Sequence, residues 1–119
     1  MDFFKGKTVV VTGASSGIGK ALAEYFAAAG ANVVLGARHE EKLKESVDTI
    51  VSKGGHAAYS VCDVTQEADS KRLIDTAVGT FGGVDVLICN AGVSMRALFD
   101  EVDLSVLHKL MDVNFWGCV

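Results

Sequence analysis

The alternation of short strand-like runs with helix-period stripes is the feature of this sequence that most constrains its fold. Strand-like runs occupy positions 8–11, 32–37, 56–62 and 84–89, and the first of them is β-branched throughout. Apolar residues recur at intervals of three and four after each run, which predicts helices over 18–29, 40–53, 66–81 and 103–117. Alternation at roughly thirty residues per unit favours βαβ units and a parallel sheet. We therefore predict an α/β fold, the first half of a Rossmann-type doubly wound sheet, with about four strands alternating with about four helices.

The pattern also predicts the buried face of the first helix and the N-cap of the third. The apolar stripe of the first helix consists of Ile18, Leu22, Tyr25, Phe26 and Ala29, which would form its buried face. Gly30 follows at the position of a C-terminal cap. Thr65 precedes the third helix, and its hydroxyl is a candidate N-cap.

Composition narrows the class of protein. Half of the 119 residues are apolar, 22% are charged, and the net charge is −4, so one folded domain spanning residues 1–119 is expected. The acidic balance argues against nucleic-acid partners, and no apolar stretch is long enough for a membrane span. The three cysteines are too scattered for a disulfide framework and predict a cytoplasmic protein, with Cys62 and Cys89 as core thiols. The histidines do not have metal-ligand spacing, so we expect no metal site.

A glycine-rich segment, residues 12–19, lies between the first predicted strand and the first predicted helix. Its glycines follow the spacing Gly-x3-Gly-x-Gly, at Gly13, Gly17 and Gly19. Such a turn lets the backbone approach a pyrophosphate and directs the first amides of the helix toward it. Gly19, one turn into the helix, would allow close packing of helix on sheet. Taken alone, the segment also fits a flexible loop without a ligand.

Three further segments give the turn a context. Asp63-Val64 follows the third strand, Asn90-Ala91-Gly92 follows the fourth, and Asn114 falls in the last predicted helix. Together with Thr12-Gly-x3-Gly-x-Gly they resemble, over essentially the whole chain, the short-chain dehydrogenase/reductase family. The resemblance implies an oxidoreductase that transfers a hydride reversibly between NAD(P) and a small-molecule carbonyl or alcohol.

The resemblance also implies roles for individual residues. Those that match the pyrophosphate and ribose turn are Gly13, Ser15, Ser16, Gly17, Ile18 and Gly19. Asp63 and Val64 match the pair that holds the adenine edge. Asn90, Ala91 and Gly92 match the segment that lines the cofactor. Asn114 matches the catalytic asparagine that supports a water-linked proton relay.

Charge at the end of the second strand predicts which cofactor is preferred. NAD-binding folds usually carry an acidic residue there, where it accepts hydrogen bonds from the ribose. This strand ends at Ala37 and is followed by Arg38, with no carboxylate before Glu40. A guanidinium can form a charge-assisted fork with a 2′-phosphate. We therefore predict NADP(H) over NAD(H), with Arg38 as the determinant, although a solvated arginine at a strand end is the alternative interpretation.

The sequence lacks the catalytic tyrosine of the family. Neither Tyr25 nor Tyr59 is followed four residues later by lysine, so no Tyr-x3-Lys acid/base pair is present. We predict that these 119 residues alone do not turn over substrate and are the portion before the catalytic Ser, Tyr and Lys. A non-catalytic dinucleotide-binding module and an engineered half-fold remain the alternatives. Strand 84–89 would be an unpaired apolar edge, which predicts a homo-oligomer.

Overall fold

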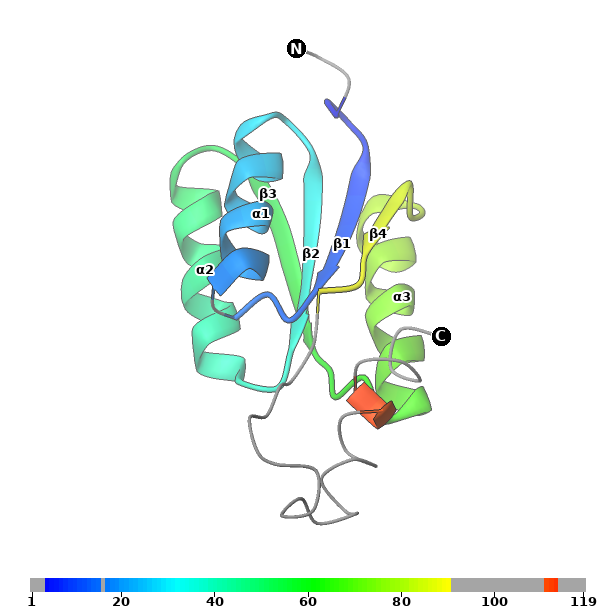
Figure 1. Ribbon diagram of the computed structural model, residues 1–119. Coiled ribbons are helices and arrows are strands. Elements are labelled where there is room, and N and C mark those ends of the chain that lie inside the picture. The colour runs from blue at the N-terminus through cyan, green and yellow to red at the C-terminus, as the bar shows by residue number, and fades with distance from the viewer. Residues whose placement is uncertain (1–3, 16, 91–110, 114–119) are drawn as a thin grey trace.

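A four-stranded parallel sheet forms the centre of the protein, as Figure 1 shows. The computed structural model describes residues 4–15, 17–90 and 111–113. The strands are β1 (Thr8–Thr12), β2 (Asn32–Ala37), β3 (His56–Val61) and β4 (Val86–Ile88). The helices between them are α1 (Gly17–Ala28), α2 (Glu40–Ser52) and α3 (Glu67–Phe81). The sheet order is β3-β2-β1-β4 and every pair is parallel, which confirms the predicted Rossmann-type topology. Most of the predicted helix 103–117 lies outside the described residues.

The two central strands are buried on both faces because helices cover both sides of the sheet. Side chains alternate along β1: Val9 and Val11 pack in the cluster that includes α1 and α2, whereas Val10 packs with α3. All three valines have no exposed surface. Buried parallel strands have continuous apolar runs for this reason, which is the pattern seen at 8–11.

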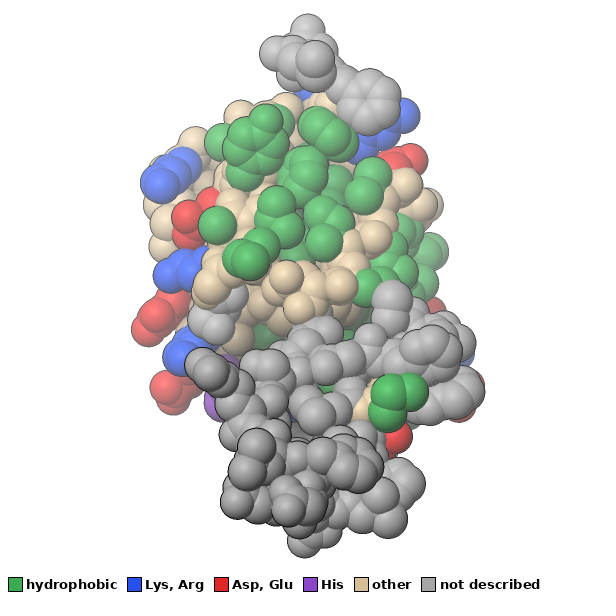
Figure 2. Space-filling view, in the orientation of Figure 1, with side chains coloured by type: hydrophobic (Ala, Val, Ile, Leu, Met, Phe, Trp, Pro, Cys, Tyr) green, Lys and Arg blue, Asp and Glu red, His purple; other side chains and the backbone are tan. Residues whose placement is uncertain are grey.

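The predicted buried face of α1 is only partly right, because Phe26 packs partly buried against the core whereas two other members of the stripe are exposed. The residues that α1 buries are Gly19, Ala23 and Ala27, and Ile18 is instead 71% exposed. Tyr25 is 66% exposed, and its ring makes an edge-to-face contact with the ring of Phe26. The reason is size, because small residues let the helix axis approach the sheet and larger apolar residues are displaced to the flanks. Figure 2 shows hydrophobic side chains on the visible face, over the region where Figure 1 draws β1 and β2.

The predicted start of the third helix is also corrected. Helix α3 begins at Glu67 with Gln66 at its N-cap, and no side chain caps it there. The hydroxyl of Thr65 donates instead to the Asp63 carboxylate, at 2.6 Å. At the other end, Gly82 adopts the left-handed conformation with φ 89°, and its N–H donates to the Val78 carbonyl, as the glycine there predicts.

Parallel strand order places the functional candidates on one edge. The carboxyl ends of parallel strands lie together, and β1 and β4 are direct neighbours. The turns that follow β1, β2, β3 and β4 therefore open on the same edge of the sheet, which Figure 1 shows at the lower end of the strands. We call this the carboxyl edge.

Candidate functional site

Four predicted site residues lie in the turns that follow the strands at the carboxyl edge. Gly13 comes directly after β1 and Arg38 directly after β2. Asp63 and Asn90 come two residues after the ends of β3 and β4. Ligands of open parallel sheets bind at this edge, where the connections diverge to opposite faces. Here α1 returns on one face and α3 on the other, so the divergence falls beside β1.

The glycine turn uses backbone conformations that favour glycine. Gly13 has φ +64° and Gly17 has φ +60°, both in the left-handed region that disfavours other residues. A Cβ atom on Gly17 would meet nothing within 4 Å, so that side of the turn is open. A Cβ on Gly19 would instead clash with the Gly13 carbonyl oxygen and lie 2.5 Å from Asn90 Nδ2. Gly19 therefore allows the close approach of α1 to the turn.

The N-terminus of α1 is suited to an anion. Its first turn contains no acidic residue, whereas the first turns of α2 and α3 each contain two. No carboxylate in the first turn of α1 therefore neutralises the free amides and the positive end of the helix dipole. Two left-handed glycines, an open surface and this helix end fit a pyrophosphate group.

Asn90 joins the end of β4 to the glycine turn. Its backbone N–H donates to Thr12 Oγ1 at 3.0 Å, and its side-chain Nδ2 donates to the Gly13 carbonyl at 3.3 Å. The Thr12 hydroxyl also donates to the Ile88 carbonyl at 3.4 Å. These bonds fix the turn relative to the neighbouring strand β4, so Asn90 stabilises the conformation of the turn.

The segment after β3 is held by its own hydrogen bonds. Asp63 Oδ1 accepts from the N–H of Thr65 at 2.9 Å as well as from its hydroxyl. The backbone N–H of Asp63 donates to Asp69 Oδ2 at 3.1 Å, and Val64 packs partly buried against the α3 side of the sheet. Asp69 is a further residue of this segment, beyond those predicted from the sequence. The signal for it is an acidic residue at the third helical position, from which a carboxylate can reach back past the helix start.

Arg38 lies exposed directly after β2. Within the part of the chain that the structure describes, its guanidinium forms no ion pair. The backbone near it is tied to the glycine turn, because the N–H of Ala14 donates to the Gly36 carbonyl at 3.2 Å. Arg38 thus follows a strand end that is linked to the turn and carries a positive charge open to a ligand.

Some predicted site residues cannot be placed. Ser16, Ala91, Gly92 and Asn114 lie outside the described residues. Among the residues that are described, no group of three or more His, Cys, Asp or Glu side chains could hold a metal ion. Over the same ranges, no helix combines the length and the apolar character needed to cross a membrane.

The two cysteines of the described ranges have different environments. Cys62 is buried as predicted, but Cys89 is exposed, because the chain leaves the sheet after the short strand β4. Burial raises the pKa of the Cys62 thiol above its ordinary value of 9.0, partly opposed by a hydrogen bond with Ser70. The folded protein therefore holds the Cys62 proton more tightly than the unfolded chain does. Its free energy of unfolding falls as pH rises past 9.0, because only the unfolded chain then releases this proton readily.

This difference predicts unequal reactivity toward alkylation. At pH 8 we expect iodoacetamide to modify Cys62 at least about tenfold more slowly than Cys89, because only a thiolate in contact with solvent reacts. Peptide mapping by mass spectrometry measures both rates in one sample. Equal rates in the folded protein would show that Cys62 is not protected, and labelling in denaturant is the control for intrinsic reactivity.

The fold and the edge together define a class of protein. A parallel sheet in the order β3-β2-β1-β4, with a glycine turn leading into the first helix, is the Rossmann-type arrangement. The family model for short chain dehydrogenases matches residues 7–119. The chain therefore belongs to the short-chain dehydrogenase family, whose members are oxidoreductases that use a nicotinamide dinucleotide.

Individual relatives agree with this assignment. The chain is 43% identical over 115 residues to an uncharacterized oxidoreductase, YxnA, of Bacillus subtilis, covering 97% of this chain and 32% of that protein. It is 41% identical over 117 residues to 3beta-hydroxysteroid dehydrogenase 1 of Eggerthella lenta, covering 98% and 45%. The crystal structure of a short-chain type dehydrogenase/reductase from Mycobacterium marinum superposes with a TM-score of 0.91 at 38% identity, covering 96% and 46%. The chain thus spans between 32% and 46% of the length of these proteins.

Proposed function

We propose that this chain is the cofactor-binding half of an NADP(H)-dependent oxidoreductase that acts on a small-molecule carbonyl or alcohol. The observation that carries the proposal is the packing of Gly19 against Gly13 and Asn90, which holds the glycine turn at the N-terminus of α1. A turn that packs this closely against its helix suits a ligand whose phosphates approach the backbone. When bound, NADP(H) supplies or accepts the hydride.

The described residues contribute binding rather than proton transfer. Gly13 and Gly17 give the turn its left-handed backbone, the space beside Gly17 is open, and the amides of α1 would face the pyrophosphate. Asp63 and Val64 would hold the adenine edge, the one through its carboxylate and the other through its backbone amide. Asn90, with Ala91 and Gly92, would line the cofactor beside β1 and β4, and Asn114 would support the proton relay. Ser15, Ser16 and Ile18 complete the proposed cofactor contacts.

Preference for NADP(H) rests on Arg38. The position holds an exposed guanidinium at the carboxyl edge, and no carboxylate intervenes before Glu40 in α2. A 2′-phosphate beside this guanidinium gains a charge-assisted hydrogen bond of about 1.5–3 kcal/mol. NADH lacks that phosphate and gains nothing from Arg38.

Equilibrium binding tests the proposal directly. We expect the chain to bind NADPH, with a Kd for NADH about ten- to a hundredfold higher, since each factor of ten corresponds to about 1.4 kcal/mol. Quenching of tryptophan fluorescence or isothermal titration calorimetry measures both constants, with adenosine as a control that lacks the phosphates. No binding of either dinucleotide by the folded chain would contradict the function. Equal affinities would contradict only the NADP preference.

Four broader features belong to the same proposal. The protein is proposed to be cytoplasmic and to have small-molecule rather than nucleic-acid partners. The 119 residues are also proposed to form a homo-oligomer through β4, because this strand lies at one edge of the described sheet and Leu87 on it is 48% exposed. The 119 residues alone are proposed to bind cofactor without turnover, because they contain no Tyr-x3-Lys pair.

A further inference from the structure

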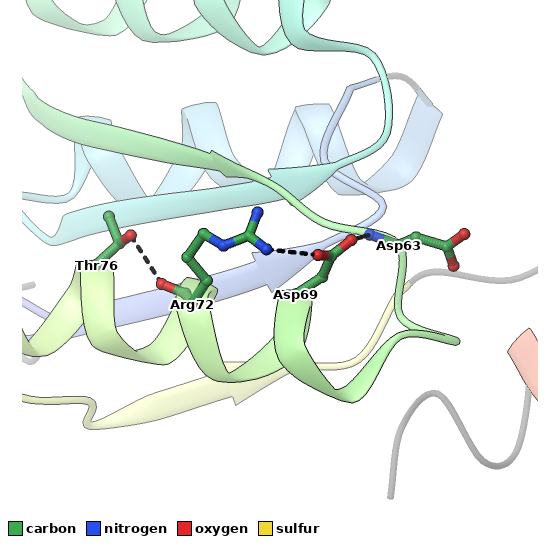
Figure 3. A network of polar contacts seen from close by, with 4 residues as sticks. All are labelled: Asp63, Asp69, Arg72 and Thr76. Carbon is green, nitrogen blue, oxygen red and sulfur yellow. Dashed lines mark hydrogen bonds and ion pairs between the residues drawn. The ribbon is translucent and has the colours of Figure 1, made fainter.

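Asp69 connects helix α3 to the turn that follows β3, as Figure 3 shows. One oxygen of its carboxylate, Oδ2, accepts the backbone N–H of Asp63 at 3.1 Å. The other, Oδ1, accepts from Arg72 Nη2 at 2.9 Å, one helical turn further along α3. Each carboxylate oxygen thus accepts a hydrogen bond, one from the turn before the helix and the other from a residue of α3.

This contact replaces the usual arrangement at a helix start. An acidic side chain at the third helical position normally bonds the N–H of the N-cap residue, which here is Gln66. Asp69 reaches three residues further back, to Asp63, while the N–H of Gln66 donates to the Asp63 carbonyl at 2.9 Å. Both backbone polar groups of Asp63 are therefore bonded to the beginning of α3. The orientation of the turn follows the orientation of the helix.

Burial separates this interaction from an ordinary surface ion pair. The Asp69 side chain is 23% exposed, whereas Lys71 and Asp75, which pair at 3.6 Å on the same helix, are 80% and 64% exposed. Solvent screens the second pair, which contributes little. The bond from Asp69 to the Asp63 amide is better shielded and is charge-assisted. Arg72 restrains the carboxylate from its other side.

We infer that Asp69 is a positioning residue for the adenine-binding turn, Asp63-Val64. The inference rests on the proposed function, because it assumes that this turn meets the adenine. In this role Asp69 acts through the turn rather than on the cofactor itself. It fixes the backbone from which the Asp63 carboxylate and the Val64 amide project, and so lowers the conformational cost of ordering the turn when adenine binds.

Replacement of Asp69 should weaken adenine binding without unfolding the protein. For Asp69→Ala we expect adenosine 2′,5′-bisphosphate and NADPH each to bind about tenfold more weakly, measured by isothermal titration calorimetry. Asp69→Asn retains an oxygen that can accept the Asp63 N–H, so its affinities should return to within about threefold of the original. Asp75→Ala is the matched control: it removes an acidic residue of the same helix that pairs with Lys71, and binding should not change.

A second readout reports the positioning itself. Hydrogen exchange at the Asp63 amide, followed by NMR, should accelerate in Asp69→Ala and not in Asp75→Ala, because only the first loses the acceptor. If Asp69→Ala does not fold, Asp69→Ser takes its place, since its shorter side chain is tolerated at a helix start but does not reach Asp63. The same tenfold loss is expected for it.

The outcomes separate this inference from the proposed function. If the unmodified chain binds neither NADPH nor the bisphosphate, the proposed function fails and the inference fails with it. If the unmodified chain binds both, and the folded Asp69→Ala or Asp69→Ser variant binds equally tightly, only the inference is overturned. An equal loss of affinity in Asp75→Ala would also overturn it, because the effect would then be one of helix charge.

Discussion

Replacing Gly19 by alanine is expected to destabilise the protein and to weaken NADP(H) binding at least tenfold. The new Cβ would collide with the Gly13 carbonyl oxygen, a backbone atom, and with the Asn90 amide nitrogen. Helix α1 cannot move outward without losing the contacts of Ala23 and Ala27 with the sheet. Overpacking of this kind costs about 1–3 kcal/mol. The same displacement moves the α1 amides away from the glycine turn, so we expect stability and affinity to fall together.

A glycine in another helix provides the control. Gly79 lies in α3, and a Cβ there would meet nothing within 4 Å. Gly79→Ala should therefore stabilise the protein by about 0.5–1 kcal/mol, because alanine favours the helix. Urea unfolding measures both variants, and fluorescence titration with NADPH measures their affinities. If Gly19→Ala were as stable and bound as tightly as Gly79→Ala, the close approach of α1 to the turn would not matter.

Arg38→Asp is expected to abolish or reverse the cofactor preference. The variant loses the charge-assisted bond to the 2′-phosphate and places a carboxylate where it repels that phosphate. It also supplies an acceptor for the ribose hydroxyls of NADH. We expect the ratio of the NADPH and NADH dissociation constants to change by about a hundredfold, with most of the change in NADPH.

The control for Arg38→Asp carries the same change in charge at a distant point. Lys53 is the C-cap residue of α2, at the opposite end of that helix from Arg38. Lys53→Asp should leave the ratio of dissociation constants within about twofold, because exposed charges more than about 10 Å apart are largely screened. Isothermal titration calorimetry with both cofactors tests the pair. An unchanged ratio in Arg38→Asp would assign the preference to other residues.

The parallel sheet and the close packing at the glycine turn were predictable because they depend on strong, simple patterns. Buried parallel strands require continuous apolar runs, and the run at 8–11 indicated a strand with helices on both faces. The spacing of Gly13, Gly17 and Gly19 indicated a turn with close helix packing, and the structure has this packing, with left-handed backbone at Gly13 and Gly17 in addition. A residue type that a backbone conformation requires can be recognised in a sequence.

Features that depend on competition between neighbours were not predictable. The stripe containing Ile18 and Tyr25 is apolar, but the smaller residues Ala23 and Ala27 fit closer to the sheet, and hydrophobicity alone does not measure that fit. Thr65 could cap a helix or bond to Asp63, and the sequence does not rank those two partners. The bond from Asp69 to the Asp63 amide depends on where β3 ends relative to α3, which only the assembled fold defines.

The hydrogen bonds between Asn90 and the glycine turn have a consequence for the order of folding. They join residues 77 and 78 positions apart in the chain, so they form only after β4 has docked beside β1. Contacts between distant residues carry the largest loop-closure cost and are slow to form. The glycine turn is synthesised before β4, yet it takes its supported shape only once β4 lies beside β1. Competence of the turn for the proposed cofactor therefore requires the pairing of β1 with β4, and the first βαβ unit does not provide it.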